Sequence, residues 1–265
     1  MLKSNNEIEK IIEYMKAHWP SLVKPEWQVG LGEYPEIAKK VLSILGKQKT
    51  RNGQLIRIAG LSGSGKTTQI LPAAEAYFES RKMQPVLVAA RRFVEYHPHY
   101  QEILEFYGEE NIRKMTDEFA TIMMFLVLEG LIKNRFDIIL DVTLLDPAME
   151  AILLKMTKEN NYQCMLLMTA VSTEVTQKFL DKRNWRHTKE TEQEFARATE
   201  LALDFYAKNS LKMRSVFWNA YDLEPIYDGN IENGVSIFKK YSQEINIPEH
   251  DEEMLKRAKI NYLKR

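Results

Sequence analysis

Eight consecutive residues, from Gly60 to Thr67, read Gly-Leu-Ser-Gly-Ser-Gly-Lys-Thr and satisfy the pattern G-x-x-x-x-G-K-[ST]. Residues 55–59 before them form an apolar run typical of a strand, and residues 67–80 after them have helical character. A glycine-rich loop between a strand and a helix is the context in which this pattern binds phosphate. Glycines let the backbone turn its N–H groups inward, toward an anion at the positive end of the helix. The sequence therefore predicts that the chain binds a nucleoside triphosphate.

The same pattern assigns roles to single residues. Lys66 would reach the β- and γ-phosphates, and the hydroxyl of Thr67 would be a ligand of Mg²⁺. An accidental glycine-rich turn is the alternative, and the complete pattern between a strand and a helix disfavours it. The predicted nucleotide-binding residues are Gly60, Ser62, Gly63, Ser64, Gly65, Lys66, Thr67 and Thr68.

Composition restricts the remaining classes of protein. The chain has 265 residues, the length of one or two domains, and its 45% apolar and 28% charged residues are ordinary for a globular protein. Lys plus Arg and Asp plus Glu both number 37, which argues against bulk attraction to nucleic acid or an anionic membrane. No apolar stretch approaches a bilayer span, the N-terminus lacks a signal-peptide core, and the lone Cys164 cannot form an intrachain disulfide. We therefore expect a cytoplasmic protein that binds neither nucleic acid nor membrane.

Apolar runs alternate with helical stretches along the chain. The expected strands are residues 55–59, 85–90, 137–141, 163–170 and 225–227. The expected helices lie around residues 67–80, 103–107, 112–134, 147–159, 173–183 and 191–217. Strands that are apolar without polar alternation are covered on both faces, as in a parallel sheet. This pattern predicts an α/β fold of the P-loop NTPase or kinase type, with a doubly wound, mostly parallel sheet flanked by helices.

The ends of the chain are expected to be helical additions to this fold. Residues 1–50 would form an N-terminal extension with helices at 6–18 and 34–45, separated by an interruption between Pro20 and Gly32. Residues 51–245 would form the α/β domain. Residues 246–265 would form a charged, solvated terminal helix.

Ligands of such sheets bind at the carboxyl ends of the strands, which directs attention to three segments: the glycine loop, residues 90–100 and residues 141–146. The apolar run at 137–141 ends in Asp141, which would lie near Mg²⁺ or orient a substrate. Capping of the following turn is the alternative role of this aspartate. The phosphate loop upstream favours the functional role.

Two basic segments are further candidates. Arg183 and Arg186 follow a predicted helix, where they could neutralise transferring phosphates or form a solvated basic turn, and both readings stay open. Arg197 lies within a predicted helix, where an outward-facing arginine is expected. In the segment 91–100, His97 and His99 suggest metal ligands, but no cysteine or acidic cluster at ligand spacing supports them. A turn in which Pro98 opens a helix is favoured there.

Together these segments resemble the zeta toxin family of P-loop kinases, roughly over residues 55–227. The most specific segment runs from Phe93 to Tyr100, ends His-Pro-His-Tyr, and looks like the family's stretch after its second strand. Residues 140–147, Leu-Asp-Val-Thr-Leu-Leu-Asp-Pro, are similar to the family's strand-end segment, commonly Ile-Glu-Gly-Thr followed by Leu-Arg-Asp-Pro. Arg183 and Arg186 match the family's arginines around the closing segment at a shorter spacing, and Arg197 fits the longer spacing.

The resemblance implies an ATP- and Mg²⁺-dependent kinase, often the toxin of a bacterial toxin–antitoxin pair. The family's best-known substrate is UDP-N-acetylglucosamine, phosphorylated on a sugar hydroxyl. The implied partners are a nucleoside triphosphate, a small-molecule acceptor and a proteinaceous antitoxin. The implied catalytic residues are Lys66, Asp141, Arg183 and Arg186, with Thr67 and Asp141 at the metal. The implied substrate-binding residues are Arg91, Glu95, His97 and Thr143.

The sequence departs from the family pattern in the acceptor half of the site. The family's catalytic aspartate falls on Arg91, and a second acidic position falls on Ala89. Asp141, Val142 and Leu145 stand where the family commonly has glutamate, glycine and arginine. Arginine stays protonated and cannot act as a general base.

Three consequences of the Arg91 substitution stay open. Asp141, or after it Glu95, could receive the proton of the acceptor hydroxyl. The acceptor could differ, for example by carrying a phosphate that Arg91 grips. Transfer could also be lost, which would leave a nucleotide-binding pseudokinase that acts as a regulatory or interaction module.

Overall fold

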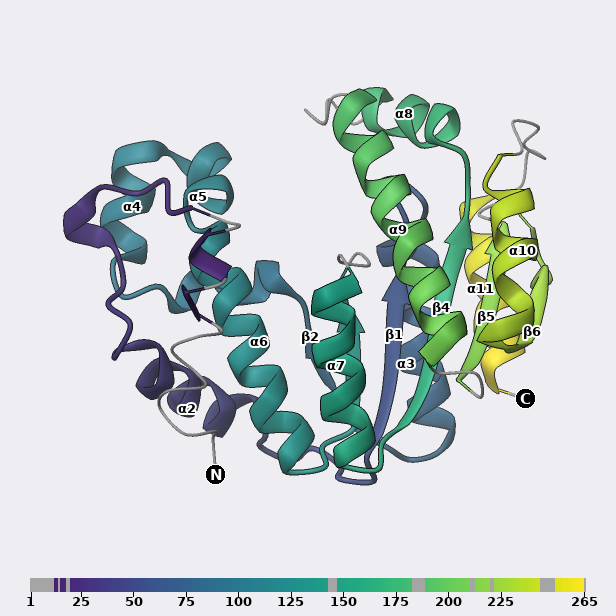
Figure 1. Cartoon of the computed structure of the whole chain (residues 1–265), viewed down its shortest axis with the longest axis horizontal. Helices are drawn as coiled ribbons and strands as arrows, with labels where there is room; N and C mark the ends of the chain where they lie inside the picture. The colour runs from purple at the N-terminus through teal and green to yellow at the C-terminus, as the bar shows by residue number, and fades with distance from the viewer. Residues whose placement is uncertain are drawn as a thin grey trace. The chain divides into compact units, whose positions relative to one another are not determined.

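The computed structural model describes residues 12–13, 15–17, 20–142, 147–182, 189–209, 213–219, 222–243 and 251–264 (Figure 1). The chain divides into two compact units. The first comprises Met1–Asn52 and Val86–Ile138, and the second comprises Gly53–Pro85 and Ile139–Arg265. The predicted division into residues 1–50, 51–245 and 246–265 stays a prediction.

Six strands form one sheet in the order β2-β3-β1-β4-β5-β6. Their bounds are β1 Gln54–Ala59, β2 Val86–Val88, β3 Ile138–Asp141, β4 Gln163–Ala170, β5 Arg214–Asn219 and β6 Tyr227–Asn230. Within the second unit β4 pairs in parallel with both β1 and β5, whereas β6 is antiparallel to β5. The predicted mostly parallel sheet is therefore confirmed.

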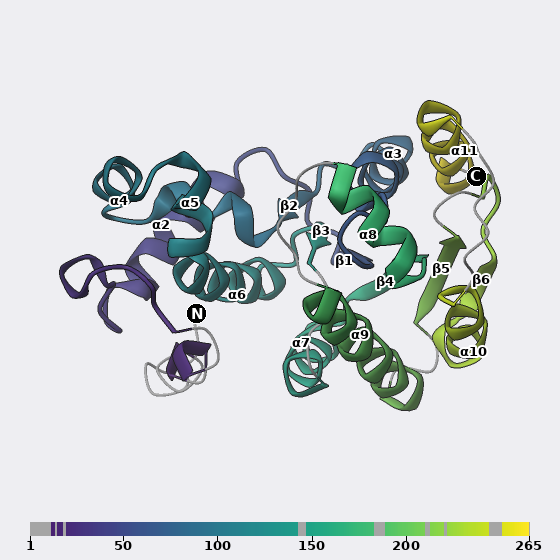
Figure 2. The same cartoon turned by 90° about the horizontal axis from the view of Figure 1, so that it is seen from above.

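Helices cover both faces of the sheet in the second unit (Figure 2). One face carries η2 (Lys66–Ile70), α3 (Leu71–Ser80) and α11 (Glu252–Lys264). The other face carries α7 (Pro147–Glu159), α9 (Lys189–Asn209) and α10 (Ile231–Tyr241), while α8 (Thr173–Lys182) follows β4. Coverage on both faces explains why β1 and β4 read as continuous apolar runs. Their core includes Ala59, Leu166, Met168, Leu203, Phe217 and Phe238.

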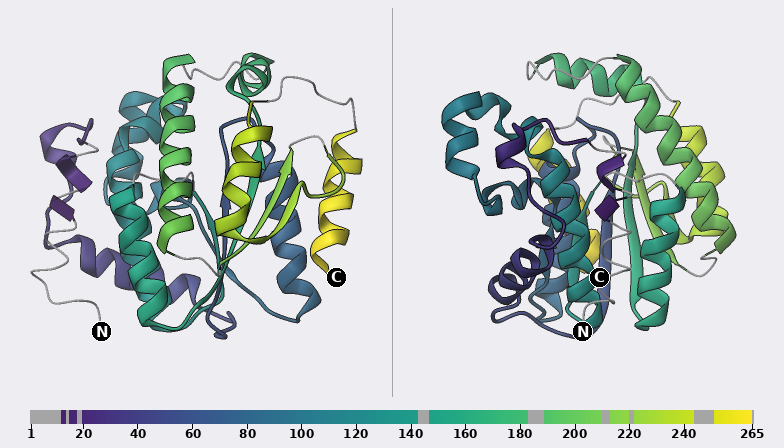
Figure 3. Two further views of the ribbon diagram at one scale, coloured as in Figure 1. Left: turned by 45° about the vertical axis from the view of Figure 1, so that its right-hand side comes forward. Right: turned by 60° about the vertical axis from the view of Figure 1, so that its left-hand side comes forward.

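The first unit contains the long helix α6 (Asp117–Lys133), which is buried along nearly its whole length. Figure 3 gives two further views of the ribbon. Helix α2 (Tyr34–Leu45) packs closely against α6, since a Cβ atom added at Gly130 would lie 2.7 Å from the Leu42 side chain. The remaining elements of this unit are η1 Pro25–Trp27, η3 Ala90–Arg92, η4 Val94–Tyr96, α4 Tyr100–Tyr107 and α5 Glu109–Met115.

Four predictions of secondary structure are wrong. The helix expected over residues 191–217 ends at Asn209, and Arg214–Asn219 is β5. The strand expected at 225–227 begins only at Tyr227, and helix α10 after it has no predicted counterpart. The run from Ser215 to Trp218 is buried at every position, which a strand between β4 and β6 can achieve and one face of a helix cannot.

The third wrong prediction is the single helix over residues 112–134, which divides into α5 and α6 at Thr116. The hydroxyl of this buried residue donates to the carbonyl of Ile112, 2.8 Å away, and its backbone lies outside helical geometry. The fourth is the solvated terminal helix: α11 is helical, but Leu255, Lys259 and Leu263 are buried on one of its faces. Most of the helix predicted at residues 6–18 lies outside the described residues.

No helix in the described part of the chain is both long and apolar enough to cross a bilayer.

Candidate functional site

The phosphate loop follows the carboxyl end of β1, and its glycines take positive-φ conformations that other residues rarely adopt. Gly60, Gly63 and Gly65 have φ values of 139°, 76° and 84°. A Cβ atom at Gly60 would also lie 2.6 Å from Oγ1 of Thr169 and 2.9 Å from Oγ of Ser64. Both conformation and space therefore require glycine here. The loop that the sequence pattern predicts is present as a backbone turn leading into a helix.

The helix after the loop begins with a widened turn. Gly65 is its N-cap, and its carbonyl accepts the N–H groups of Gln69 (2.9 Å) and Ile70 (3.4 Å). Pro72, which lacks an N–H and crowds the carbonyl four residues earlier, follows this turn directly. The hydroxyl of Thr68 is buried and has no hydrogen-bond partner among the described residues. An unsatisfied hydroxyl beside an anion-binding turn fits a site for phosphate oxygen.

Lys66 lies folded across the loop. Its ammonium donates to the carbonyls of Gly60 (2.6 Å) and Leu61 (2.8 Å). These contacts hold the ammonium next to the backbone turn. With a phosphate in the loop, the ammonium would exchange its two carbonyl acceptors for charged phosphate oxygens. Such charge-assisted hydrogen bonds are roughly twice as strong as neutral ones.

Thr169 fastens the loop to β4. Its hydroxyl lies 2.7 Å from the Ser64 hydroxyl, and both side chains are buried. Thr169 occupies the position before the last residue of β4, beside β1 in the sheet. The sequence analysis missed this residue, although a hydroxyl near the carboxyl end of an apolar strand is a usable signal.

Asp141 is the last residue of β3 and is 8% exposed. Strand β3 is next to β1 in the sheet. Asp141 therefore lies at the end of the strand that neighbours β1, and β1 leads into the loop. A carboxylate is the kind of hard oxygen ligand that Mg²⁺ prefers. Thr143, Arg183 and Arg186 lie outside the described residues. Arg197 lies in α9 with an exposed side chain, as expected.

A cavity of about 320 Å³ opens beside the first residues of the loop. It lies among Gly60, Leu61, the end of β4 and helices α9 and α10. Its described lining holds the carboxylates Glu174 and Glu200 and no lysine or arginine. This negative charge is unfavourable for the phosphates of a nucleotide.

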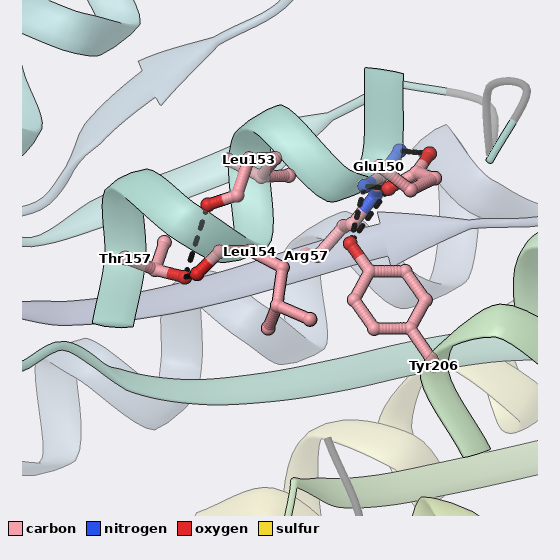
Figure 4. Close-up of polar contacts among 6 residues, drawn as sticks. All are labelled: Arg57, Glu150, Leu153, Leu154, Thr157 and Tyr206. Carbon is pink, nitrogen blue, oxygen red and sulfur yellow. Dashed lines mark hydrogen bonds and ion pairs between the residues drawn. The ribbon is translucent and has the colours of Figure 1, made fainter. Parts of the chain in front are cut away.

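A buried ion pair that was not predicted from the sequence joins β1 to α7 (Figure 4). Arg57 of β1 makes a two-pronged contact with Glu150 of α7, in which Nη2 donates to Oε1 over 2.8 Å and Nη1 donates to Oε2. Tyr206 of α9 donates to Oε2 of the same carboxylate, 2.6 Å away. Burial raises the pKa of Tyr206, so its hydroxyl keeps the donated proton. The three side chains join two helices to the strand that leads into the loop.

The segment around Arg91 belongs to the first unit. Arg91 and Glu95 are exposed, in η3 and η4 respectively. His97 is 4% exposed, and its ring packs edge-on against Phe119 at 4.6 Å. Burial lowers the pKa of His97 to about 4, with His99 acting in the same direction, so this imidazole is neutral near pH 7.

Two further features of this segment bear on the predictions for it. Pro98 lies in a turn two positions before Tyr100, the first residue of α4, which confirms the predicted turn into a helix. Within the described residues, no group of three or more His, Cys, Asp or Glu side chains is placed to hold a metal ion.

The sheet and its loop define a P-loop α/β protein of the nucleotide-binding type. Residues 43–213 match the family model described as zeta toxin, and the chain belongs to the zeta toxin family. One relative is Toxin PezT of Streptococcus pneumoniae serotype 4 (strain ATCC BAA-334 / TIGR4), 26% identical over 131 residues. The match covers 49% of this chain and 50% of PezT, so it spans half the length of that relative.

Solved structures show the same fold. A chain from the PezAT chromosomal toxin–antitoxin system of the human pathogen Streptococcus pneumoniae has a TM-score of 0.64 at 18% identity, covering 89% of this chain and 98% of that one. A chain of the native AvrRxo1-ORF1:AvrRxo1-ORF2 complex has a TM-score of 0.51 at 13% identity, with coverages of 97% and 84%. These likenesses establish the fold: a mostly parallel sheet flanked by helices.

Proposed function

We propose that the chain is an ATP- and Mg²⁺-dependent phosphotransferase that moves the γ-phosphoryl group of ATP to a hydroxyl of a small acceptor. The observation that carries this proposal is the phosphate loop, with glycines at positive φ and Lys66 held across the backbone turn. Membership of the zeta toxin family supports it. In this proposal residues 51–245 form the kinase domain, with helical additions at residues 1–50 and 246–265.

The loop would bind the triphosphate. Its N–H groups and Lys66 would surround the β- and γ-phosphates, because both supply donors to phosphate oxygens. Thr67 and Asp141 would hold Mg²⁺, which neutralises charge on the phosphates when bound. Arg183 and Arg186 are proposed to neutralise charge on the group in transfer.

The transfer itself needs an attacking oxygen, a leaving group and a proton acceptor. The oxygen of the acceptor hydroxyl would bond to the γ-phosphorus while the bond to the β,γ-bridging oxygen breaks and ADP leaves. The hydroxyl proton would pass to a carboxylate, with Asp141 the first candidate and Glu95 the second. Arg91, Glu95 and Thr143 are proposed to bind the acceptor. His97, buried against Phe119, would hold the Arg91–Glu95 segment rather than touch the acceptor.

Transfer of ³²P tests this function. The purified chain would be incubated with γ-labelled ATP, Mg²⁺ and either UDP-N-acetylglucosamine, the family's precedent, or a metabolite extract. We expect a labelled small molecule with the wild type and none with Lys66→Ala. Absence of both label transfer and ATP consumption by the wild type would reject a kinase.

Arg91 favours a second candidate, a nucleotide-binding pseudokinase that acts as a regulatory or interaction module. It stands at the position of the family's catalytic aspartate, and loss of a general base costs about 10²- to 10⁴-fold in rate. ATP binding without transfer or hydrolysis would favour this candidate. Arg91→Asp separates the two, since it would raise transfer to the family's acceptor only if position 91 faces the acceptor.

A proteinaceous antitoxin is the proposed macromolecular partner. Support comes from the family and from PezAT, whose structure is described as a toxin–antitoxin system. Purification of the tagged chain from its native cells, followed by quantitative mass spectrometry, would test the proposal. A single co-purifying protein at equal molar amount is expected, and its absence would contradict a stable antitoxin complex.

A further inference from the structure

The last helix, α11, carries a lysine where its buried stripe should be apolar. Leu255, Lys259 and Leu263 are 2%, 0% and 3% exposed, and their spacing of four residues places them on one face of the helix. Helix α11 lies beside α3 (Figure 2) and contacts both α3 and η2, the turn that begins with Lys66. The helix lies outside residues 43–213, the part that matches the family model.

Lys259 is costly at this position. Burial lowers its pKa to about 8, with Asp222 opposing the shift. The side chain is nevertheless charged near pH 7, so the fold keeps a charged side chain on the buried face of α11. A methionine of similar length would pack there without that desolvation cost. Lys259 therefore does something that an apolar residue could not.

The ammonium of Lys259 holds the chain beyond β5. Its Nζ donates to the backbone carbonyl of Asp222, 3.1 Å away. Asp222 in turn donates its N–H to the carbonyl of Asn219, the last residue of β5, over 3.2 Å. In doubly wound sheets this carboxyl edge is where ligands bind.

Tyr262 makes a second contact between α11 and the sheet. Its ring packs edge-on against Trp218 of β5 at 5.9 Å, and its hydroxyl donates to Asp228 of β6, 2.8 Å away. One helix therefore contacts the start of the phosphate-loop helix and two neighbouring strands of the sheet.

We propose that α11 is a C-terminal latch in which Lys259 acts as a positioning residue for nucleotide binding. Lys259 fixes the Asp222 carbonyl, and helix α11 packs on η2. Through these two contacts Lys259 sets the position of the phosphate-loop helix relative to the carboxyl end of β5. The inference rests on the proposed binding of ATP at the loop. Substitutions away from a ligand that act through packed elements change coupling by roughly 2- to 30-fold in affinity.

Lys259→Met tests the latch, with Lys264→Met as the control because Lys264 is exposed on the same helix. Urea unfolding at pH 7 would measure stability, calorimetry would measure the affinity for ATP with Mg²⁺, and hydrogen exchange would follow the amides of Gln69, Ile70 and Asp222. For Lys259→Met we expect stability equal to or above the wild type, roughly 2- to 30-fold weaker ATP binding and faster exchange at those amides. The control should match the wild type in all three.

The outcomes separate the latch from a purely structural role. Unchanged ATP affinity and unchanged exchange in Lys259→Met would overturn the inference. A loss of stability that accounts for the loss of affinity would also overturn it, because Lys259 would then only hold the fold together. If the wild type itself binds no ATP, the proposed function fails, and the exchange measurement alone still decides whether Lys259 orders the loop helix.

Discussion

The buried Arg57–Glu150–Tyr206 contact should make the second unit unusually sensitive to loss of one charge. Glu150→Leu removes the carboxylate that accepts hydrogen bonds from both Arg57 and Tyr206. It leaves the Arg57 guanidinium, 4% exposed, without its counter-charge. Removing one partner of a buried ion pair costs roughly 3–5 kcal/mol, which for a chain of this size lowers the melting temperature by roughly 6–20 °C.

Replacement of the whole contact should behave differently. In the triple variant Arg57→Met/Glu150→Leu/Tyr206→Phe no charge of this contact is left buried, and apolar replacements of buried ion pairs are often neutral or stabilising. We therefore expect the triple variant to be about as stable as the wild type, and clearly more stable than Glu150→Leu. Urea unfolding followed by circular dichroism and by tryptophan fluorescence would measure the free energies of unfolding.

A more exposed pair supplies the control. Lys239 and Asp204 lie 2.9 Å apart with side chains 35% and 43% exposed, and exposed pairs contribute only about 0.2–1 kcal/mol. Asp204→Asn should therefore change stability by less than about 1 kcal/mol. The reasoning would be refuted if Glu150→Leu cost no more than Asp204→Asn, or if the triple variant were less stable than Glu150→Leu.

Three smaller predictions concern the loop and the first unit. Gly60→Ala should weaken ATP binding at least about tenfold by calorimetry, because a Cβ atom would meet Thr169 at 2.6 Å and strain a loop residue at φ 139°; wild-type affinity in this variant would count against the loop geometry. Thr169→Val should cost about 0.5–1.5 kcal/mol of stability in urea through loss of its bond to Ser64, and no change would mean that the bond is dispensable. The pKa of His97 is about 4 in the folded chain and 6.5 as its usual value. As pH falls, the unfolded state therefore binds this proton before the folded state does. The wild type should therefore lose stability as pH falls from about 6.5 toward 4, by at most about 1.4 kcal/mol per pH unit, whereas His97→Gln should lack this component; parallel pH profiles of the two proteins would contradict the assignment.

Most elements of the fold could be predicted from local patterns in the sequence. The loop from Gly60 to Thr67 could be recognised because strand, glycines, lysine and helix are contiguous in the chain. Strand β5 could not, because the apolar run at Ser215–Trp218 follows a long amphipathic helix and is equally consistent with its continuation. Pairing with β4 and β6, a non-local contact, decides for a strand there.

The contacts that support the site could not be predicted, because they also join residues far apart in the sequence. Thr169 meets Ser64 across 105 positions of sequence, and Arg57 meets Glu150 across 93. Spacing in a single sequence does not indicate such pairs. His97 was assigned to substrate binding by the family resemblance, and the sequence could not show that its ring packs against Phe119.

The proposed chemistry depends on the nucleotide site. Calorimetric titration would measure the affinity of this site for ATP with Mg²⁺, in the wild type and in Lys66→Ala. We expect one ATP bound for each wild-type chain and binding that is lost or weakened at least about tenfold in Lys66→Ala. A wild-type chain that takes up no ATP, or a Lys66→Ala variant that binds it equally well, would contradict the assignment of the loop as a triphosphate site.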